Sequence, residues 1–218
     1  MDRPPPRAYR DRKEAGRALA AKLDAYRGTP GLLVLGLARG GVPVGWEIAA
    51  ALGAELDVFL VRKLGVPRWP ELAMGALASG GGVVMNHRVV SSLQIDDEQV
   101  RGVVERETAE LRRREHLYRG DRPPADPRGR IVIVVDDGIA TGASILVAVR
   151  ALRAGGPTAV VVAVPVGPKS VCQQVADEAD AVVCAMMPDD FEAVGQVFVD
   201  FHQVSDDEVR ELLVSPTV

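Results

Sequence analysis

Residues 131–144 read IVIVVDDGIATGAS, and this stretch decides the fold class of the chain. Its first five residues are apolar and β-branched, which predicts a short buried strand over 131–135. Two aspartates, two glycines and two hydroxyl side chains follow. A helix is predicted over 143–153, because the glycines and the proline at 155–157 stop it. A strand, a small-residue loop and a helix therefore follow one another.

Further apolar runs extend this pattern along the chain. They cover residues 32–37, 56–61, 159–164 and 181–185. A helix is predicted over 44–52, with Pro43 in its first turn. Runs without polar alternation, separated by helices, are typical of a parallel sheet that is covered on both faces. An all-helical fold is excluded, because the runs are too short and too β-branched for buried helices. We therefore expect an α/β fold with a central, mainly parallel sheet and helices on both faces.

The rest of the chain is predicted to belong to one domain over residues 9–218. Residues 1–8 are a Pro-rich, flexible lead-in, and Asp11 caps a helix that runs to about residue 26. Residues 66–130 form an insertion between two core strands. Its glycine-rich residues 79–82 predict a hairpin.

A long charged helix is predicted within this insertion, over residues 96–118. Its apolar stripe contains Val100, Val104 and Leu111. A polar, Pro-rich linker follows over 119–130.

Composition excludes several classes of protein. The 218 residues are 47 % hydrophobic and 26 % charged, so the chain is not a disordered polymer. A net charge of −4 argues against binding to a nucleic-acid backbone. Two cysteines and three dispersed histidines exclude a disulfide-rich scaffold and argue against a zinc site. No signal peptide or membrane segment is expected, since the uncharged windows are shorter than the ~20 residues that span a bilayer. We expect a soluble, cytoplasmic protein.

Asp136 and Asp137 leave the carboxyl end of the predicted strand, which is the edge where open α/β sheets bind ligands. The helix start after them, with the hydroxyls of Thr141 and Ser144, is a ready site for a phosphate. Carboxylates beside a phosphate site favour a sugar phosphate as the ligand. A helix cap or a solvated loop would also explain the acidic pair taken alone. A Walker A loop is excluded because no Gly-Lys-Ser/Thr follows, and a haloacid-dehalogenase motif would need Asp in place of Val135.

Residues 131–144 resemble the phosphoribosyl pyrophosphate (PRPP) motif of the type I phosphoribosyltransferases. The resemblance implies that Asp136 and Asp137 bind the ribose 2- and 3-hydroxyls. The residues that it assigns to substrate binding in the following loop are Gly138, Ala140, Thr141, Gly142, Ala143 and Ser144. The likeness extends over residues 9–209, to a subgroup of small bacterial proteins of this family, and includes 70–76 and 191–195.

Two further segments are similar to the pyrophosphate-binding parts of this family: residues 35–41, with Arg39, Gly40 and Gly41, and the pair Arg62 and Lys63. Glycines let a backbone approach an anion closely. We expect all three cations to leave the carboxyl ends of parallel strands, and so to converge on the edge that carries the acidic pair. Cations around a departing pyrophosphate stabilise it, which makes these three side chains the predicted catalytic residues. A surface turn or a solvated strand end would also accommodate them.

The acceptor site is less well marked. Family members that act on 6-oxopurines have an acidic residue where this chain has Ala140, so the chain is closer to the adenine, uracil or orotate patterns, and it matches none of those closely elsewhere. Residues 186–204 are the candidate hood, and Phe191 is the candidate acceptor-binding residue. Packing on the sheet is the alternative for Phe198 and Phe201.

The resemblance implies transfer of the 5-phosphoribosyl group from PRPP to a nucleobase or related amine, with release of pyrophosphate. Mg²⁺ would be held mainly through PRPP, without protein ligands. The insertion corresponds to the family's mobile loop, and its arginines at 112–114 and 119 either reach pyrophosphate or form a solvated face paired with glutamates. The expected assembly is a homodimer that binds no nucleic acid and no membrane. The alternative function is a non-catalytic regulator that binds PRPP or a nucleotide.

Overall fold

The computed structural model describes residues 8–214, so the predicted lead-in lies, apart from Ala8, outside the described residues. Its centre is a five-stranded sheet in the order β2-β1-β6-β7-β8, in which every neighbouring pair is parallel. The strands are β1 (Leu33–Leu37), β2 (Glu55–Phe59), β6 (Ile131–Val135), β7 (Ala159–Val166) and β8 (Ala181–Met186). The predicted fold class is confirmed, and β6 has the predicted bounds.

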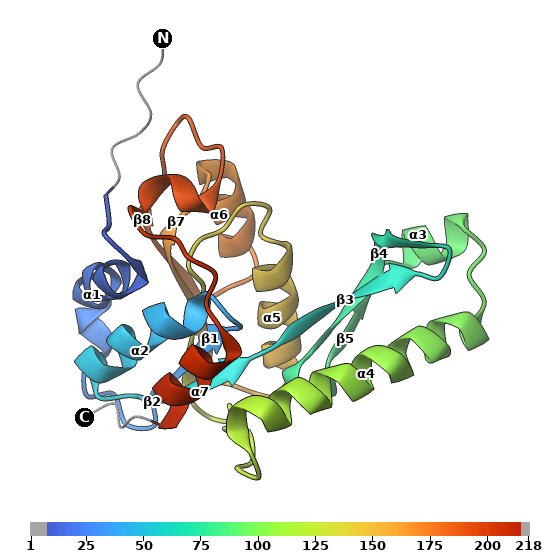
Figure 1. Ribbon diagram of the computed structural model, residues 1–218, viewed down its shortest axis with the longest axis horizontal. Coiled ribbons are helices and arrows are strands. Elements are labelled where there is room, and N and C mark those ends of the chain that lie inside the picture. Colours follow the sequence, from blue (N-terminus) through green and yellow to red (C-terminus); the bar gives the residue numbers. More distant parts are fainter. Residues whose placement is uncertain (1–7, 215–218) are drawn as a thin grey trace.

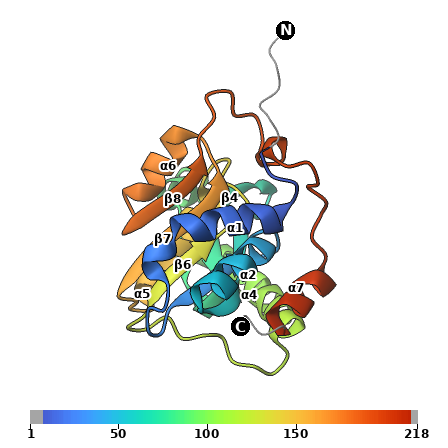
Figure 2. The same ribbon diagram turned by 90° about the vertical axis from the view of Figure 1, so that its left-hand side faces the viewer.

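Helices cover both faces of this sheet (Figures 1 and 2). One face carries α1 (Arg12–Lys22), α2 (Gly41–Leu52) and α7 (Asp206–Val214), and the other carries α5 (Ala143–Ala154) and α6 (Lys169–Ala176). Alternate residues of β6 point into the two layers, Ile133 toward α2 and Val132 toward α5. Because both faces are buried, the strands are apolar throughout, which is the pattern that predicted them.

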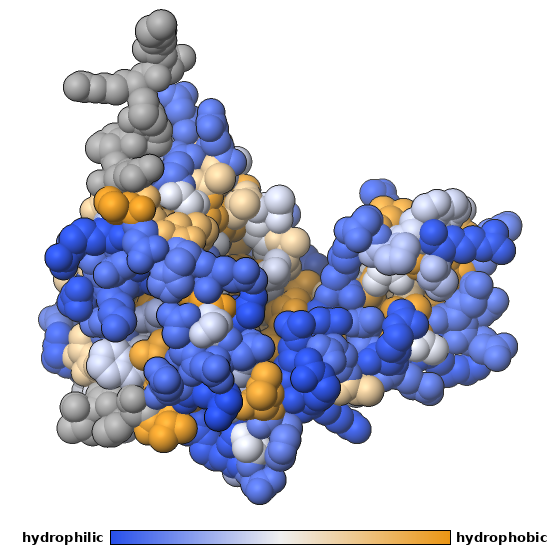
Figure 3. Space-filling view, viewed as in Figure 1, coloured by the Kyte–Doolittle hydropathy of each residue, from blue (hydrophilic) through white to orange (hydrophobic). Residues whose placement is uncertain are grey.

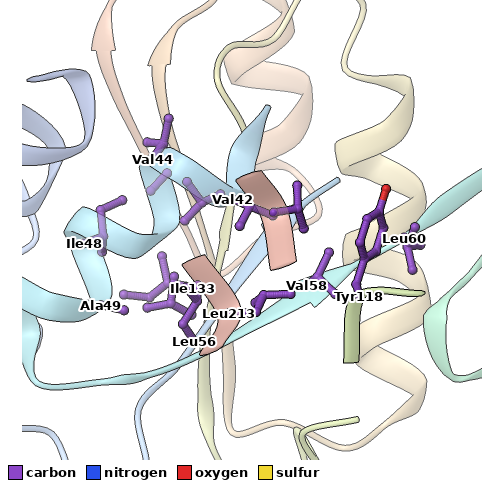
Figure 4. Packing of buried hydrophobic residues seen from close by; sticks show 14 of the residues in the cluster. Val42, Val44, Ile48, Ala49, Leu56, Val58, Leu60, Tyr118, Ile133 and Leu213 are labelled. Atoms are coloured by element: carbon purple, nitrogen blue, oxygen red, sulfur yellow. The ribbon is translucent and has the colours of Figure 1, made fainter. Parts of the chain in front are cut away.

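The core on the α2 side consists mainly of aliphatic side chains, with Tyr118 of α4 among them (Figure 4). Val42, Ile48 and Ala49 of α2 pack with Ile133 of β6. Leu213 of α7 belongs to the same cluster. The C-terminal helix is therefore part of the main core.

Asp11 caps α1, as predicted, and accepts a hydrogen bond from the Glu14 N–H at 2.8 Å. The helix ends at Lys22, and a short 3₁₀ turn, Asp24–Tyr26, follows it. Helix α2 begins at Gly41, three residues earlier than predicted. Pro43 fits within its first turn because the backbone N–H groups there need no partner inside the helix.

The insertion forms an arm that projects from the body (Figure 1). Its antiparallel sheet contains β3 (Val61–Val66), β4 (Trp69–Ala78) and β5 (Val83–Met85), followed by α3 (His87–Ser92) and α4 (Asp97–Arg119). The predicted hairpin joins β4 to β5 through a 3₁₀ turn, Ser79–Gly81.

The arm sheet begins at Val61, five residues before the predicted start of the insertion. The predicted run 56–61 is divided at Leu60, because Val61 already pairs with Ala78 of β4. The backbone of Leu60 exchanges hydrogen bonds with Ser79, which fixes this point of departure from the parallel sheet.

Helix α4 is anchored to the body at its C-terminal end. Asp57 of β2 is 2 % exposed and accepts hydrogen bonds from Arg119 Nε at 2.9 and 3.0 Å. The Ala125 N–H donates to the same carboxylate at 2.9 Å. Of the predicted stripe, Leu111 is buried, and the stripe also includes Val103 and Tyr118. This contact joins the arm and the linker after it to the edge strand of the parallel sheet.

Candidate functional site

The acidic pair and the β1–α2 loop meet at the carboxyl edge of the parallel sheet. β1 and β6 are neighbours, and Gly36 pairs with Val135 near their carboxyl ends. The loop after β1 therefore lies against Asp136 and Asp137. The peptide bond between Ala38 and Arg39 in this loop is cis.

Gly40 and Gly41 permit this close contact. A Cβ atom on Gly40 would lie 2.1 Å from Asp137 Oδ2, and one on Gly41 would lie 2.3 Å from the Val135 carbonyl oxygen. Neither space admits a side chain. We predicted these glycines from the approach of an anion, whereas the contact in the structure is with the acidic pair itself. Both glycines are thus required to assemble the edge before any ligand binds.

Asp136 and Asp137 occupy different electrostatic environments. The Asp137 N–H donates to Asp136 Oδ1 at 2.9 Å. Burial, and then the charge of Asp137, raises the pKa of Asp136 well above its usual range. Burial also raises the pKa of Asp137, but Arg12 opposes that effect through its charge and its hydrogen bond. The two carboxyl groups are therefore not equivalent.

Arg12 is a site residue that the sequence reasoning missed. Its Nε and Nη2 atoms both lie 2.8 Å from Asp137 Oδ2, although the two residues are 125 positions apart. The sequence contained a pattern from which a buried role for Arg12 could have been predicted. Arg12 shares the buried face of α1 with Ala15 and Leu19, at helical spacing, and a cation on such a face needs a buried partner.

The loop between β6 and α5 presents polar groups at a helix start. Thr141, Ala143 and Ser144 are exposed, as is Ala140. Gly142 has a left-handed backbone (φ 75°), and the Ala143 N–H donates to Thr141 Oγ1 at 3.4 Å. The first turn of α5 thus leaves N–H groups and hydroxyls facing solvent, an arrangement that binds a phosphate.

Gly138 is buried, and a Cβ atom there would lie 2.5 Å from Val194 Cγ1. This contact places the candidate hood directly beside the loop.

Arg39 follows β1 at the sheet edge, as predicted. Its Nη1 lies 3.5 Å from Asp206 Oδ1 of α7. Asp206 also accepts a hydrogen bond from the Tyr118 hydroxyl at 2.6 Å. Burial, together with this hydrogen bond, raises the pKa of Tyr118 to about 12. Arg39 is therefore paired with the C-terminal helix.

The predicted placement of Arg62 and Lys63 at the end of a parallel strand is wrong. Both belong to β3, in the antiparallel sheet of the arm, because the parallel strand β2 already ends at Phe59. Arg62 donates to Glu107 Oε2 from Nε at 3.1 Å and from Nη2 at 2.5 Å. Lys63 Nζ lies 3.1 Å from Glu71 Oε2. Each cation thus has a carboxylate partner within the arm.

Two cavities adjoin β3. One, of about 400 Å³, lies mainly within the arm, between β3 and α4, and is lined by Arg62, Lys63 and, at its border with the β1–α2 loop, Ala38. The other, of about 740 Å³, lies between the arm and α5 and is lined by Lys63 and Ser144 among others. The space-filling view shows the surface hollowed between the arm and the body (Figure 3). Arg62 and Lys63 therefore face space that borders the edge, without touching the acidic pair.

Three of the four arginines at 112–114 and 119 of α4 pair with acidic side chains, and the fourth, Arg112, is exposed. Arg113 and Arg114 pair with Glu110 at 2.7 and 2.9 Å, and Arg119 pairs with Asp57 and Glu115. The prediction of a solvated face paired with glutamates therefore describes Arg113 and Arg114, whereas the side chain of Arg119 is only 4 % exposed.

The candidate hood packs against the N-terminal part of the chain. Phe198 is buried between Tyr9 and Phe201, with ring centroids 5.8 and 5.0 Å away. Phe191 is half-buried against the same cluster. The alternative expectation of packing therefore describes Phe198, and the acceptor role of Phe191 stays a prediction.

Two properties concern the described residues as a whole. Residues 8–214 contain no group of three or more His, Cys, Asp or Glu side chains that could hold a metal ion. In the same range, no helix is both long enough and apolar enough to cross a membrane.

Comparisons with known proteins agree on one family. The model of a family described as "Phosphoribosyl transferase domain" matches residues 8–202. Proteins of two Mycobacterium tuberculosis strains, each named "Putative phosphoribosyl transferase", are 46 % identical over 205 residues, which is 94 % of this chain and 46 % of theirs. The chain thus spans about half the length of these curated relatives.

Among solved structures, TT1426 of Thermus thermophilus is 42 % identical, with 94 % of this chain and 97 % of that chain covered and a TM-score of 0.81. A hypothetical protein from Neisseria gonorrhoeae with bound ppGpp is 13 % identical, with 98 % of each chain covered and a TM-score of 0.50. The second likeness concerns the fold alone.

Proposed function

The chain belongs to the type I phosphoribosyltransferase family, and from that premise we propose that it transfers the 5-phosphoribosyl group of PRPP to a nitrogenous acceptor. One observation carries the proposal. The acidic pair, the β1–α2 loop and the first turn of α5 lie together at the carboxyl edge of the parallel sheet. A sugar phosphate needs hydroxyl acceptors and a phosphate site side by side, and this edge offers both.

Each part of the edge has a proposed role. Asp136 and Asp137 bind the ribose hydroxyls, and the loop 138–144 binds the 5-phosphate through its exposed N–H and hydroxyl groups. Arg39 binds pyrophosphate from the β1–α2 loop, and to do so it exchanges Asp206 for phosphate oxygens. Arg62 and Lys63 approach pyrophosphate from the arm, and they exchange their glutamate partners likewise.

In the proposed reaction, the lone pair of the acceptor nitrogen forms a bond to C1 of the ribose. The bond from C1 to the pyrophosphate oxygen breaks, and its electron pair leaves with pyrophosphate. The acceptor nitrogen then gives up its proton to solvent. No covalent protein intermediate is required, so the rate comes from positioning and from stabilisation of the departing charge.

We propose that Mg²⁺ accompanies PRPP and is held mainly by its phosphate oxygens, because Mg²⁺ takes few protein ligands when phosphates are present. When bound, it neutralises part of the charge that develops on pyrophosphate. The chain's own cations supply the remainder.

Release of pyrophosphate tests the function. The protein is incubated with PRPP, Mg²⁺ and a panel of purines, pyrimidines and amines, and pyrophosphate is assayed. We expect release with at least one acceptor and none from the variant Asp136→Asn/Asp137→Asn, which lacks both proposed ribose ligands. Binding of PRPP without release in the presence of any acceptor would contradict the transferase and support the PRPP- or nucleotide-binding regulator instead.

We propose further that the protein acts as a cytoplasmic homodimer and binds neither nucleic acid nor membrane. The net charge of −4 supports the absence of a nucleic-acid partner. Trp69 and Leu72 of β4 are 55 % and 45 % exposed, and a protein contact at the arm would cover both. Sedimentation at the monomer mass would contradict the dimer.

A further inference from the structure

Arg12 is a buried cation at the start of α1 that contacts only one member of the acidic pair. It is 8 % exposed, its Nε donates to Asp137 Oδ2 at 2.8 Å, and its Nη2 lies 2.8 Å from the same oxygen. The carboxylate of Asp136 accepts one hydrogen bond from the described residues, and it comes from the Asp137 N–H. The environment of the pair is therefore asymmetric.

The guanidinium of Arg12 is itself held from the opposite side. Its Nη1 donates to the His202 carbonyl oxygen at 2.8 Å. The group also lies over the ring of Phe201, 4.0 Å from the ring centroid. Phe201 in turn stacks on Phe198, which belongs to the buried cluster with Tyr9. Contacts from three directions fix the Arg12 guanidinium, so the side chain is held in one orientation by the folded structure.

The segment that carries these contacts lies outside the parallel sheet. His202 is fixed between Asp200, 3.1 Å from its Nδ1, and Glu208, 3.0 Å from its Nε2. The Asp200 N–H donates to the Arg10 carbonyl oxygen at 2.8 Å. The C-terminal segment 198–208 and the first turn of α1 therefore form one unit behind the acidic pair.

We infer that Arg12 is a positioning residue for PRPP. It holds Asp137 as the ionised and oriented member of the acidic pair, and residues 198–202 hold Arg12. The inference rests on the proposed function, because it assumes that the acidic pair binds ribose. Arg12 acts through Asp137 and is not proposed to touch the substrate.

The physical reason is that two adjacent, half-buried carboxylates cannot both ionise at low cost. A cation on one of them settles which carboxylate is charged. The groups that face Asp137 are Asp136 from its own loop and Arg12 from α1, while the β1–α2 loop contributes the uncharged Gly40. Behind Arg12 lies His202 with its two carboxylate partners. Within residues 8–214, Arg12 is the cation in direct contact with the pair.

The asymmetry suits a vicinal diol. Asp137, ionised, only accepts hydrogen bonds, whereas Asp136 donates one while it keeps its proton. Burial and the neighbouring charge both raise the pKa of Asp136, in line with this division. Both contacts of Arg12 are with Asp137 Oδ2, so Oδ1 is the oxygen that we expect to accept a hydrogen bond from a hydroxyl of the ligand.

The test compares Arg12→Gln and Arg12→Lys with Arg17→Gln. Arg17 lies on the same helix, is exposed and pairs with Glu47 at 3.3 Å, so its loss is a matched change of charge away from the pair. The affinity for PRPP with Mg²⁺ is measured by calorimetry between pH 5 and 9.

Arg12→Gln is expected to weaken binding at pH 7 by about tenfold or more, as loss of a hydrogen bond between charged groups does. Without the cation, burial raises the pKa of Asp137 further, so the loss of binding on the acid side moves to higher pH by about one unit. Arg17→Gln is expected to match the wild type.

Arg12→Lys keeps the charge, but without a planar fork it cannot reach both Asp137 and the His202 carbonyl. We therefore expect its loss of PRPP binding at low pH to follow that of the wild type, and its affinity for PRPP at pH 7 to be reduced by about threefold. If Arg12→Gln does not fold, Arg12→Lys provides the test, and an affinity for PRPP equal to that of the wild type would overturn the inference. So would equal pH profiles in Arg12→Gln and Arg17→Gln. An affinity lost equally at every pH would assign Arg12 a structural role only.

A second measurement separates this inference from the proposed function. The carboxyl carbon of Asp137 is titrated by NMR in the protein without PRPP, for the wild type and for the same variants. A higher apparent pKa in Arg12→Gln supports the electrostatic role of Arg12 even if the wild type binds no PRPP, which would overturn the proposed function alone. An unchanged titration overturns the role of Arg12 and leaves the proposed function standing.

Discussion

The sheet edge and the arm both carry charged residues that the family resemblance assigns to the site, but they hold them in different ways. At the edge, strand register and close backbone contact place the groups, and Gly40 lies so near Asp137 that no Cβ atom fits. In the arm, Arg62 and Lys63 lie on an antiparallel strand and are held by Glu107 and Glu71. One region is fixed by buried backbone, and the other by ion pairs near solvent.

This difference indicates which parts of the site are already in position before PRPP binds. Buried parallel strands do not shift without loss of the core, so the acidic pair and the β1–α2 loop keep their positions. The exposed pair Lys63–Glu71 contributes about 0–1 kcal/mol, and the part-buried pair Arg62–Glu107 borders a cavity, so both can be exchanged for a phosphate. We therefore expect the edge to bind PRPP and the arm to adjust to it.

The largest effect is expected from a methyl group at the edge. Gly40→Ala places a Cβ atom 2.1 Å from Asp137 Oδ2 and 2.6 Å from its Cγ, so the loop and the acidic pair must separate. We expect PRPP affinity to fall by about a hundredfold or more, because the ribose and pyrophosphate sites lose their relative position. Calorimetry with PRPP and Mg²⁺ measures the loss.

The matched control is the same substitution in the arm. A Cβ atom on Gly102 of α4 meets nothing within 4 Å. Gly102→Ala should therefore keep PRPP affinity and stabilise the protein by about 0.5–1 kcal/mol, since alanine favours a helix interior over glycine. Equal affinities in the two variants would show that the close contact at Gly40 is not needed for binding.

A smaller effect is expected at Asp136, where a substitution should stabilise the folded protein. Its pKa is raised in the folded protein, so the folded state binds this proton more tightly than the unfolded chain does. Stability is then gained as the pH falls toward the folded-state pKa, and it is lower above it. Asp136→Asn removes the buried charge and should raise the melting temperature at pH 8 by roughly 2–4 °C per kcal/mol gained.

The gain should shrink as the pH is lowered, because Asp136 is then protonated in the wild type as well. Thermal unfolding of both proteins at pH 5 and pH 8 measures this. The same variant should lose PRPP affinity, because we expect Asp136 to lower the stability of the folded protein while it binds the ligand. A melting temperature that falls at pH 8 would contradict the account of the acidic pair.

The smallest effect is expected in the arm. Glu107→Gln releases the charge of Arg62 toward the cavity that borders Ala38, and pyrophosphate should bind about threefold more tightly at low salt. The gain should disappear at high ionic strength. Glu105→Gln, which removes the same charge from an exposed position on α4, is the control. Equal changes in both variants would reveal a general effect of net charge rather than release of Arg62.

Sequence reasoning predicted the parts of the fold whose signal is local. Strand β6 and the start of α5 follow from a β-branched run and a small-residue loop, and both lie where they were expected. The acidic pair and the β1–α2 loop could be placed together because parallel strands present their carboxyl ends at one edge. The bounds of α1 and α2 were less accurate, since helix ends depend on caps and packing.

Contacts between distant residues were not predictable in the same way. Arg12 and Asp137, and Asp57 and Arg119, meet only once the chain has folded. The placement of Arg62 was wrong because the run 56–61 contains no signal for the break at Leu60, which comes from pairing with β4 and the contact with Ser79.

The most direct test of the central claim is titration of PRPP with Mg²⁺ into the wild type and into Asp136→Asn/Asp137→Asn. Both proteins are first shown to be folded by thermal unfolding. We expect saturable binding to the wild type and none to the variant. Unchanged PRPP affinity in the folded double variant would contradict the assignment of the sheet edge as the PRPP site.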